Sequence, residues 1–150
     1  PDLKIKWPND IMSGNKKIVG ILIESTLVKN KINDLIIGIG LNVNQTDFDM
    51  IKEATSMKIL QNKSFNLYII TKQFVEKFSS FEDKISNLLK DKLIEKFCSH
   101  LYGIGEKRKF VTEEKVVEGV ILGITDDYML NVELDKQVKH YDNGQIKLIL

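Results

Sequence analysis

The sequence has few of the residues that build disulfides, metal clusters or membrane spans. Its 150 residues include one cysteine, Cys98, and two histidines, His100 and His140. A single cysteine excludes an internal disulfide and a zinc site made of several cysteines, and the histidines are too far apart to suggest a metal motif. No apolar run approaches the ~20 residues needed to span a bilayer. These absences favour a globular protein in a reducing, cytoplasmic setting.

Neither positive nor negative charge predominates in the sequence. Lys and Arg number 22 against 21 for Asp and Glu, which gives a net charge of +1. Bulk charge therefore favours neither a nucleic-acid partner nor a membrane partner. With 43% hydrophobic and 29% charged residues, the composition is typical of a folded globular protein. The length fits one domain, or a larger domain followed by a very small one.

The N-terminal part of the sequence predicts β structure. Residues 3–7 form a short predicted strand, and Pro8-Asn9-Asp10 is typical of a turn. Two longer runs, 17–28 and 35–43, are rich in β-branched side chains and are separated by turn-forming residues. This arrangement predicts an antiparallel hairpin.

The middle of the sequence changes to a helical period. Residues 46–65 are polar and irregular, with one helical turn expected near 48–54. From Asn66, a suitable N-cap, apolar residues recur at spacings of three and four as far as Leu101. A single helix of that length is unusual in a small domain. We therefore expect two helices, with a break near Lys90-Asp91.

The last 45 residues return to a period of two. Turn residues divide them into five short predicted strands, at 107–112, 115–125, 128–134, 137–141 and 145–149. Five short strands in this length suggest a small SH3-like β-barrel. We expect a first domain over residues 1–104 and a second over residues 105–150.

One predicted strand has an unusual face. If residues 37–44 are extended, side chains alternate between faces, so Gly38 and Gly40 share a face with Asn42 and Asn44. Glycine inside a strand often marks the close approach of a ligand or of another backbone. The alternative is that the glycines make room for a neighbouring helix. The pattern leaves both interpretations open.

Three motifs follow one another in the N-terminal part. They are Lys6-Trp7-Pro8-Asn9-Asp10, Lys16-Lys17-Ile18-Val19-Gly20-Ile21-Leu22-Ile23-Glu24 and Gly38-Ile39-Gly40-Leu41-Asn42-Val43-Asn44. In this order and at these separations they resemble the biotin–protein ligase family, with its KWPND turn, K-x-x-G-I-L-x-E strand and G-x-G-x-N-x-N strand. Because the predicted helices and the small β domain also match that family's layout, the resemblance covers essentially the whole chain.

The resemblance implies an ATP-dependent ligase with biotin, ATP and Mg²⁺ as its ligands. Such an enzyme makes biotinyl-5′-AMP and transfers the biotinyl group to a lysine of a biotin carboxyl carrier protein. The implied fold is α+β: a mixed or antiparallel sheet backed by helices, like that of class II synthetases, followed by an SH3-like β-barrel. A homodimer is possible.

The match also implies roles for individual residues. Lys17 is expected to contact the biotin carboxylate and the α-phosphate, where a cation offsets the repulsion between two anions. Asp10 is expected to orient the carrier lysine or accept its proton. Gly20 would let the backbone approach biotin, and the Asn42 amide would offer a donor and acceptors to a base or ribose. The substrate- and nucleotide-binding residues implied by the match are Trp7, Asn9, Gly20, Gly38, Gly40 and Asn42.

Two features depart from the family pattern. Strict alternation puts Lys17 and Gly20 on opposite faces, so either Lys17 precedes the regular strand or a bulge intervenes. The family's Gly-Arg-Gly-Arg-x-Gly-Arg loop, which precedes KWPND, is not found, because the only arginine is Arg108 and the sequence begins at Pro1. We therefore expect a fragment that has little ligase activity by itself.

Three other interpretations remain. The related lipoate ligases share the lysine and glycine strand but usually lack the Trp-Pro-Asn-Asp turn. A binding module is a second alternative, in which the SH3-like domain recruits a protein or, despite the balanced charge, a nucleic acid. A non-catalytic scaffold is the third.

Overall fold

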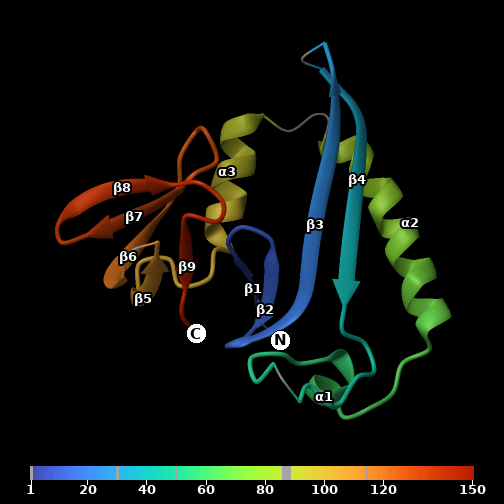
Figure 1. Cartoon of the computed structure of the whole chain (residues 1–150). Helices are drawn as coiled ribbons and strands as arrows, with labels where there is room; N and C mark the ends of the chain where they lie inside the picture. Colours follow the sequence, from blue (N-terminus) through green and yellow to red (C-terminus); the bar gives the residue numbers. More distant parts are fainter. Residues whose placement is uncertain (1, 30, 50, 86–88, 114) are drawn as a thin grey trace.

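The computed structural model describes residues 2–29, 31–49, 51–85, 89–113 and 115–150. It shows an α+β fold with two antiparallel sheets (Figure 1), which confirms the predicted class. The first sheet has its strands in the order of the chain: β1 (Leu3–Lys6), β2 (Asp10–Ser13), β3 (Lys16–Val28) and β4 (Lys31–Leu41). The predicted hairpin is β3 and β4.

The hairpin is longer than the turn residues suggested, since β4 begins at Lys31. Its register places Gly20 opposite Gly40 and Leu22 opposite Gly38. Because directly opposed residues point to the same face of a sheet, the three glycines lie together on one face. The sequence pattern had indicated this face for two of them.

A β-bulge separates Lys17 from the regular part of β3. In the ladder with β2, Val19 pairs with Ile11 but Lys17 pairs with Met12, so Ile18 is an extra residue on β3. An extra residue reverses the alternation of side chains. The bulge therefore brings the Lys17 side chain to the same face of the sheet as Gly20. This is one of the two arrangements that the sequence analysis proposed for these residues.

The segment after β4 contains a short helix, α1 (Met57–Gln61), whose N-cap is Ser56. The Ser56 hydroxyl accepts a hydrogen bond from the Ile59 amide at 3.2 Å. The helical turn expected near 48–54 is therefore wrong. Helix formation begins at the residue whose side chain caps the free N–H groups, and here that residue is Ser56.

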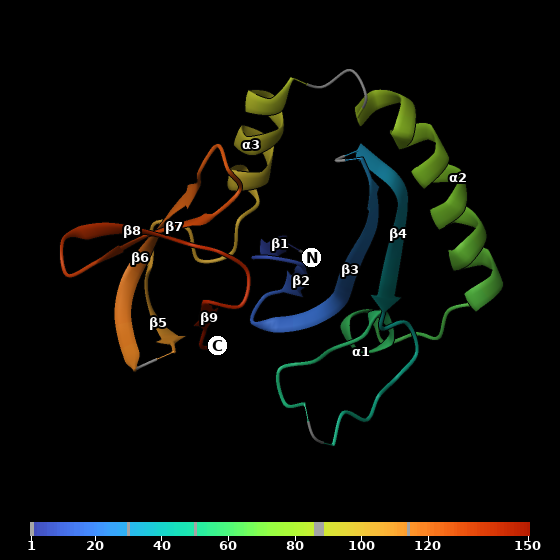
Figure 2. The ribbon, with the colours of Figure 1, turned by 45° about the horizontal axis from the view of Figure 1, so that its top comes forward.

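Two further helices follow, α2 (Leu67–Ile85) and α3 (Lys90–Ser99). The Asn66 side chain accepts a hydrogen bond from the Ile69 amide, which confirms the predicted cap. The prediction of two helices is confirmed, and α3 begins at Lys90, beside the predicted break. Helix α2 runs beside β4 (Figures 1 and 2). No helix in the described ranges is long and apolar enough to cross a membrane.

The C-terminal sheet has five strands, as predicted, in the order β8-β7-β6-β5-β9. They are β5 (Lys107–Thr112), β6 (Val116–Ile124), β7 (Leu130–Leu134), β8 (Gln137–Tyr141) and β9 (Ile146–Leu148). The outer strands β8 and β9 are not paired with each other in the described part of the chain. The sheet is therefore open, and the predicted barrel closure is not observed.

The hydrophobic core joins the two sheets. Phe110 and Val132 of the C-terminal sheet are fully buried in one cluster with Met12 of β2 and Leu101, which follows α3. The backbone of Ile5 in β1 also bonds on both sides of Leu101, through the carbonyl of His100 at 2.7 Å and the amide of Tyr102 at 2.8 Å. The division into residues 1–104 and 105–150 stays a prediction, and the two parts share this core.

Candidate functional site

The centre of the candidate site is an ion pair between Lys17 and Asp10. The Lys17 Nζ lies 2.5 Å from the Asp10 Oδ1. Asp10 is the first residue of β2, and Lys17 lies on the neighbouring strand next to the bulge. The two side chains are 41% and 20% exposed, so solvent and a ligand can reach the pair.

Gly20 leaves room for this ion pair. A Cβ at position 20 would lie 3.1 Å from the Lys17 Nζ, 3.2 Å from its Cε and 3.8 Å from the Asp10 Oδ1. The absence of a side chain therefore lets the lysine lie across β3 toward Asp10. This is a structural reason for the glycine, in addition to the approach to biotin that the resemblance implies.

The backbone of Lys17 forms hydrogen bonds with the segment before α1. Its amide donates to the Glu53 carbonyl at 2.6 Å, and its carbonyl accepts from the Thr55 amide at 2.9 Å. Thr55 and Ser56 are buried. Sequence reasoning missed this support, since residues 46–65 read as irregular. The signal that could have revealed it is Ser56, a good N-cap residue before Met57.

Hydrogen bonds of Asn9 hold the turn that precedes Asp10 against β3. Its side-chain amide donates to the Ile21 carbonyl at 2.7 Å, and its own carbonyl accepts from the Ile21 amide at 2.9 Å. The turn is therefore tied to β3 directly beside Gly20. Because both Asp10 and Lys17 are held by backbone hydrogen bonds, the ion pair is positioned before any ligand arrives.

The ion pair lies in an open cavity of about 430 Å³ over the base of the hairpin. Six of the eight predicted site residues line this cavity. Its lining consists of Asn9, Asp10, Lys17, Gly20, Ile21, Leu22, Gly38, Ile39 and Gly40.

Gly38 and Gly40 form a floor of bare backbone in this cavity. A Cβ at Gly38 would meet only Leu22 atoms, at 3.7 and 3.8 Å, and one at Gly40 only the Gly20 carbonyl, at 3.8 Å. These are ordinary contacts, and no described helix atom lies within 4 Å. The alternative that the glycines make room for a helix is therefore not supported.

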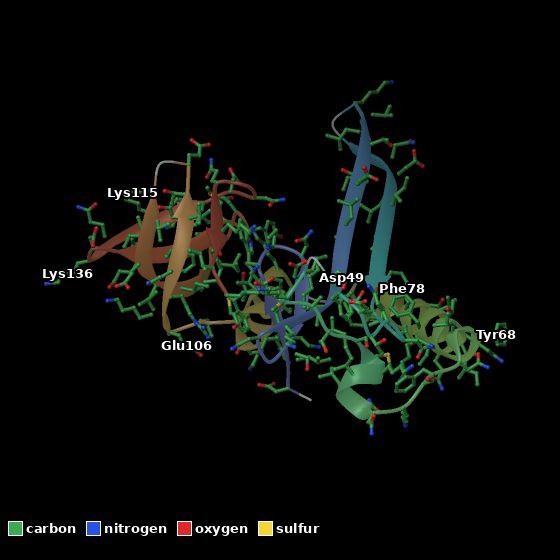
Figure 3. All side chains as sticks on the ribbon, turned by 60° about the horizontal axis from the view of Figure 1, so that its bottom comes forward. Asp49, Tyr68, Phe78, Glu106, Lys115 and Lys136 are labelled. Atoms are coloured by element: carbon green, nitrogen blue, oxygen red, sulfur yellow. The ribbon has the colours of Figure 1, made fainter. Side chains whose placement is uncertain are left out.

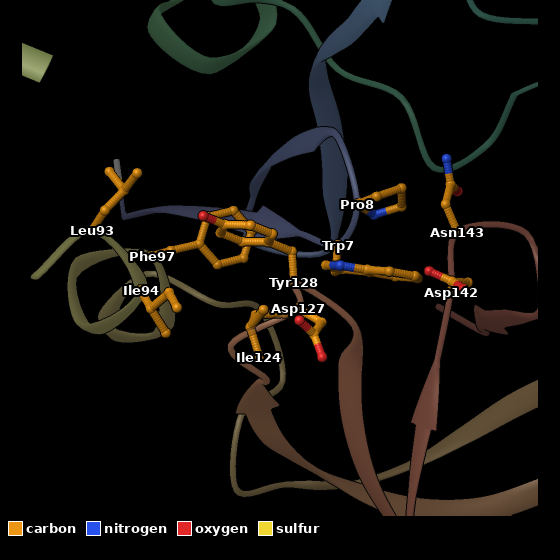
Figure 4. A pocket seen from close by; sticks show the side chains of 10 residues that line it. All are labelled: Trp7, Pro8, Leu93, Ile94, Phe97, Ile124, Asp127, Tyr128, Asp142 and Asn143. Atoms are coloured by element: carbon orange, nitrogen blue, oxygen red, sulfur yellow. The ribbon is translucent and has the colours of Figure 1, made fainter. Parts of the chain in front are cut away.

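Trp7 does not join this group. Its ring is half-buried against the hydrophobic core and lines a different cavity, of about 360 Å³, with Phe97 of α3 and Tyr128 (Figure 4). The chain reverses direction between Trp7 and Asp10, so the two ends of the motif face different neighbours. Trp7 therefore lies apart from the cavity that holds the ion pair, and its contact with a substrate stays a prediction.

Asn42 also lies outside the lining of the cavity. Its side-chain amide donates to the Thr55 carbonyl at 3.0 Å, and its backbone bonds to the Ile18 carbonyl and the Met57 amide, each at 3.0 Å. These bonds tie the end of β4 to the segment that supports Lys17. Contact between Asn42 and a nucleotide stays a prediction.

The arrangement suits the binding of an anion beside an apolar group. An ammonium that already holds a carboxylate can exchange it for a phosphate or carboxylate of a ligand, and a glycine floor lets a flat or extended molecule approach the sheet. Over the described ranges, no group of three or more His, Cys, Asp or Glu side chains could hold a metal ion.

Comparison with known proteins points to one group of enzymes. The model of the biotin/lipoate A/B protein ligase family matches residues 2–42. The bifunctional ligase/repressor BirA of Bacillus subtilis is 33% identical over 150 residues, which cover 96% of this chain and 46% of BirA. The chain therefore spans about half the length of this curated relative.

Solved structures agree with the sequence comparison. The apo biotin protein ligase of Aquifex aeolicus has a TM-score of 0.77 and 27% identity, over 98% of this chain and 65% of that one. The same ligase in complex with biotin and ATP has a TM-score of 0.76 and 26% identity, over 98% and 62% of the two chains.

Proposed function

We propose, since this chain belongs to the biotin–protein ligase family, that it forms part of an enzyme that activates biotin with ATP and biotinylates a carrier lysine. The observation that carries the proposal is the Lys17–Asp10 ion pair on a glycine floor. The Aquifex ligase, which shares the fold, has been solved with biotin and ATP. The biotin carboxyl carrier protein is the acceptor that this reaction requires.

In the first step, a carboxylate oxygen of biotin attacks the α-phosphorus of ATP. The new oxygen–phosphorus bond forms biotinyl-5′-AMP, and the bond to the β-phosphate breaks, which releases pyrophosphate. Both reactants are anionic, so a cation between them stabilises the transition state most where water is displaced. Lys17 is the ammonium in position to do this, and Gly38 and Gly40 leave space for the adenylate.

In the second step, the neutral amine of the carrier lysine attacks the acyl carbon, and AMP leaves. The attacking amine loses a proton, which a nearby carboxylate can accept. Asp10 has this role in the proposal, once the phosphate has replaced it as the partner of Lys17. Asn9 would keep Asp10 in place through its bonds to Ile21.

A magnesium ion would accompany the triphosphate. Mg²⁺ in nucleotide sites is held mostly by phosphates and water, with one or two carboxylates. Asp10 and Glu53 line a second cavity beside Lys17, so these residues fit such an ion. When bound, the ion neutralises phosphate charge.

The remaining finer assignments belong to the same proposal. Residues 1–104 would form part of a class II synthetase-like catalytic domain. Residues 105–150 would form an SH3-like domain, and the protein would act in the cytoplasm. A homodimer stays a prediction.

Substitution of Lys17 tests the role of the ion pair. In a full-length ligase that contains this chain, Lys17→Ala should remove about 2–4 kcal/mol of transition-state stabilisation, or roughly 30- to 1000-fold in the adenylation rate. The neighbouring Lys16 is exposed and does not line the cavity, so Lys16→Ala is the matched control. Pyrophosphate release and the denaturation midpoint should be measured for both. Equal rate losses, or a loss explained by unfolding, would contradict the assignment.

Substrate choice separates biotin from lipoate. The 150-residue chain should be titrated calorimetrically with non-hydrolysable biotinyl- and lipoyl-adenylate analogues, and the biotinyl analogue should bind more tightly. A preference for the lipoyl analogue would favour the lipoate ligases, which share the matched family.

A further inference from the structure

The cavity that contains Trp7 is lined by three aromatic rings from separate parts of the chain. Trp7 follows β1, Phe97 belongs to α3, and Tyr128 lies in the turn between β6 and β7 (Figure 4). With a volume of about 360 Å³, the cavity falls within the range of roughly 300–1,000 Å³ that is typical of small-molecule sites. Aliphatic side chains of α3 and β6 complete its apolar wall: Leu93, Ile94 and Ile124.

The charged side chains that line this cavity are both acidic. Asp127 precedes Tyr128 in the same turn, and Asp142 lies in the turn between β8 and β9, next to Asn143. Among the described residues, no lysine, arginine or histidine lines the cavity. Neither carboxylate has an ion-pair partner within 4.0 Å in the described part of the chain. The cavity therefore combines aromatic rings with two carboxylates that can accept a cation.

The Tyr128 ring already contacts one cation of the chain. The Lys90 Nζ lies 5.1 Å from the centroid of this ring, within the ~6 Å over which a ring face attracts a cation. Lys90 is not part of the cavity lining, so the cavity meets another part of the ring. The contact shows that the ring is placed where an ammonium can reach it.

The backbone of Tyr128 has a conformation that favours glycine. Its φ is 64°, and a hydrogen bond from its amide to the Thr125 carbonyl, at 2.9 Å, holds the turn. A bulky residue with positive φ is uncommon, because its Cβ is crowded by the backbone. The side chain is 57% exposed, so burial in the core does not compensate for this strain. Strained residues of this kind are concentrated at ligand sites.

We propose that this cavity binds a small organic cation, in which an ammonium group is carried on an apolar or aromatic body. The body would pack against the three rings, and the ammonium would face Asp127 and Asp142. A ring face attracts a cation through its quadrupole, and a carboxylate accepts charged hydrogen bonds. A neutral or anionic molecule of the same shape lacks both attractions. The site lies apart from the cavity that holds the ion pair and goes beyond the proposed ligase reaction.

Binding can be measured through Trp7, which is the only tryptophan in the sequence. Its fluorescence should change saturably as phenethylammonium is added to the 150-residue chain. Phenethyl alcohol has almost the same shape without the charge, and hydrocinnamate carries the opposite charge. We expect the neutral probe to bind about tenfold more weakly than the cation, and the anion to bind more weakly still.

Paired substitutions test the two carboxylates against a control of equal charge. Asp127→Asn combined with Asp142→Asn should weaken the binding of phenethylammonium about tenfold. The control is Asp126→Asn combined with Asp135→Asn, which changes the net charge equally outside the cavity lining. Asp135 is next to Lys136, at the far tip of the C-terminal sheet (Figure 3). The control should leave the affinity unchanged.

The ring of Tyr128 gives an independent test. Tyr128→Leu keeps a large side chain but removes the ring, so it should weaken binding about tenfold. Tyr128→Phe keeps the ring and should retain most of the affinity. Because Tyr128 is exposed, both variants should keep the denaturation midpoint of the unsubstituted chain.

Three results would overturn the cation site. The first is no saturable response to phenethylammonium, and the second is equal binding of phenethyl alcohol. The third is equal weakening by the two paired substitutions, which would mean a general effect of net charge. An unchanged affinity in Tyr128→Leu would likewise contradict the role of the ring. Denaturation midpoints measured beside each titration show that the variants compared are folded.

Discussion

The C-terminal sheet and the β3–β4 hairpin are both antiparallel ladders rich in β-branched residues, yet only the first contributes buried side chains to the main core cluster. Phe110 and Val132 in the C-terminal sheet are fully buried. On the hairpin, Leu22, Ile23 and Ile36 are 58%, 61% and 64% exposed. A strand pattern thus predicts pairing, whereas burial depends on what packs against the strands.

The residues that form the core and the residues that form the candidate site lie in different regions of the chain. The core cluster draws its members from the C-terminal sheet, β2 and the segment after α3. The candidate site instead uses the base of the hairpin, where the glycines leave the sheet bare. Substitutions in the two regions should therefore affect different measurements.

The largest contrast should come from truncating one side chain in each region. Phe110→Ala should lower the free energy of unfolding by about 3–5 kcal/mol, because it leaves a cavity in the core. Ile36→Ala removes an exposed side chain and should change it by less than about 0.5 kcal/mol. Urea denaturation of this chain measures both. A similar loss for the two variants would show that the hairpin contributes to the core after all.

Two glycines give a second contrast. A Cβ at Gly119 would lie 2.3 Å from the Leu134 Cδ2 and 2.6 Å from the Glu133 carbonyl oxygen. Since the carbonyl is backbone, Gly119→Ala should cost about 1–3 kcal/mol of stability. Gly38→Ala meets only ordinary contacts and should leave stability almost unchanged.

For ligand affinity, in contrast to stability, we expect Gly38→Ala to have the larger effect of the two substitutions. A methyl group at Gly38 would enter the floor of the cavity, so Gly38→Ala should weaken binding of the biotinyl-adenylate analogue. Calorimetric titration beside the denaturation midpoint separates the two effects. Unchanged affinity in Gly38→Ala would show that the bare floor does not contact the ligand.

The smallest expected effect is the pH dependence that arises from Lys6. Its pKa in the folded chain lies below the ordinary 10.5, so between the two values the unfolded chain binds more protons. Stability then rises with pH in that window, because the cost of holding the buried ammonium disappears.

The substitution Lys6→Gln should remove this rise. The free energy of unfolding should be compared between this variant and the unsubstituted chain at several pH values up to 10.5. Other groups, such as Lys107, whose pKa Glu118 raises through a hydrogen bond, contribute equally to both proteins. A difference that does not vary with pH would contradict the assignment.

Much of the local structure could be predicted from the sequence. Turn residues and β-branched runs located the hairpin and the five C-terminal strands, and Asn66 marked the start of α2. The motif spacing also identified six residues that share one cavity. These features depend on neighbouring residues, whose hydrogen bonds and steric preferences act over a few positions.

What the sequence could not determine depends on contacts between distant segments. Local pattern placed Trp7 with Asp10, but packing against α3 and the C-terminal sheet turned its ring toward another cavity. Lys147 belongs to none of the three motifs, and only the docking of β9 near β1 brings it to one space with Lys6 of the first motif. The sequence alone therefore determined which strands and turns form and which motif residues belong together. The tertiary structure decided which side chains face the site, because that choice depends on packing between residues far apart in the chain.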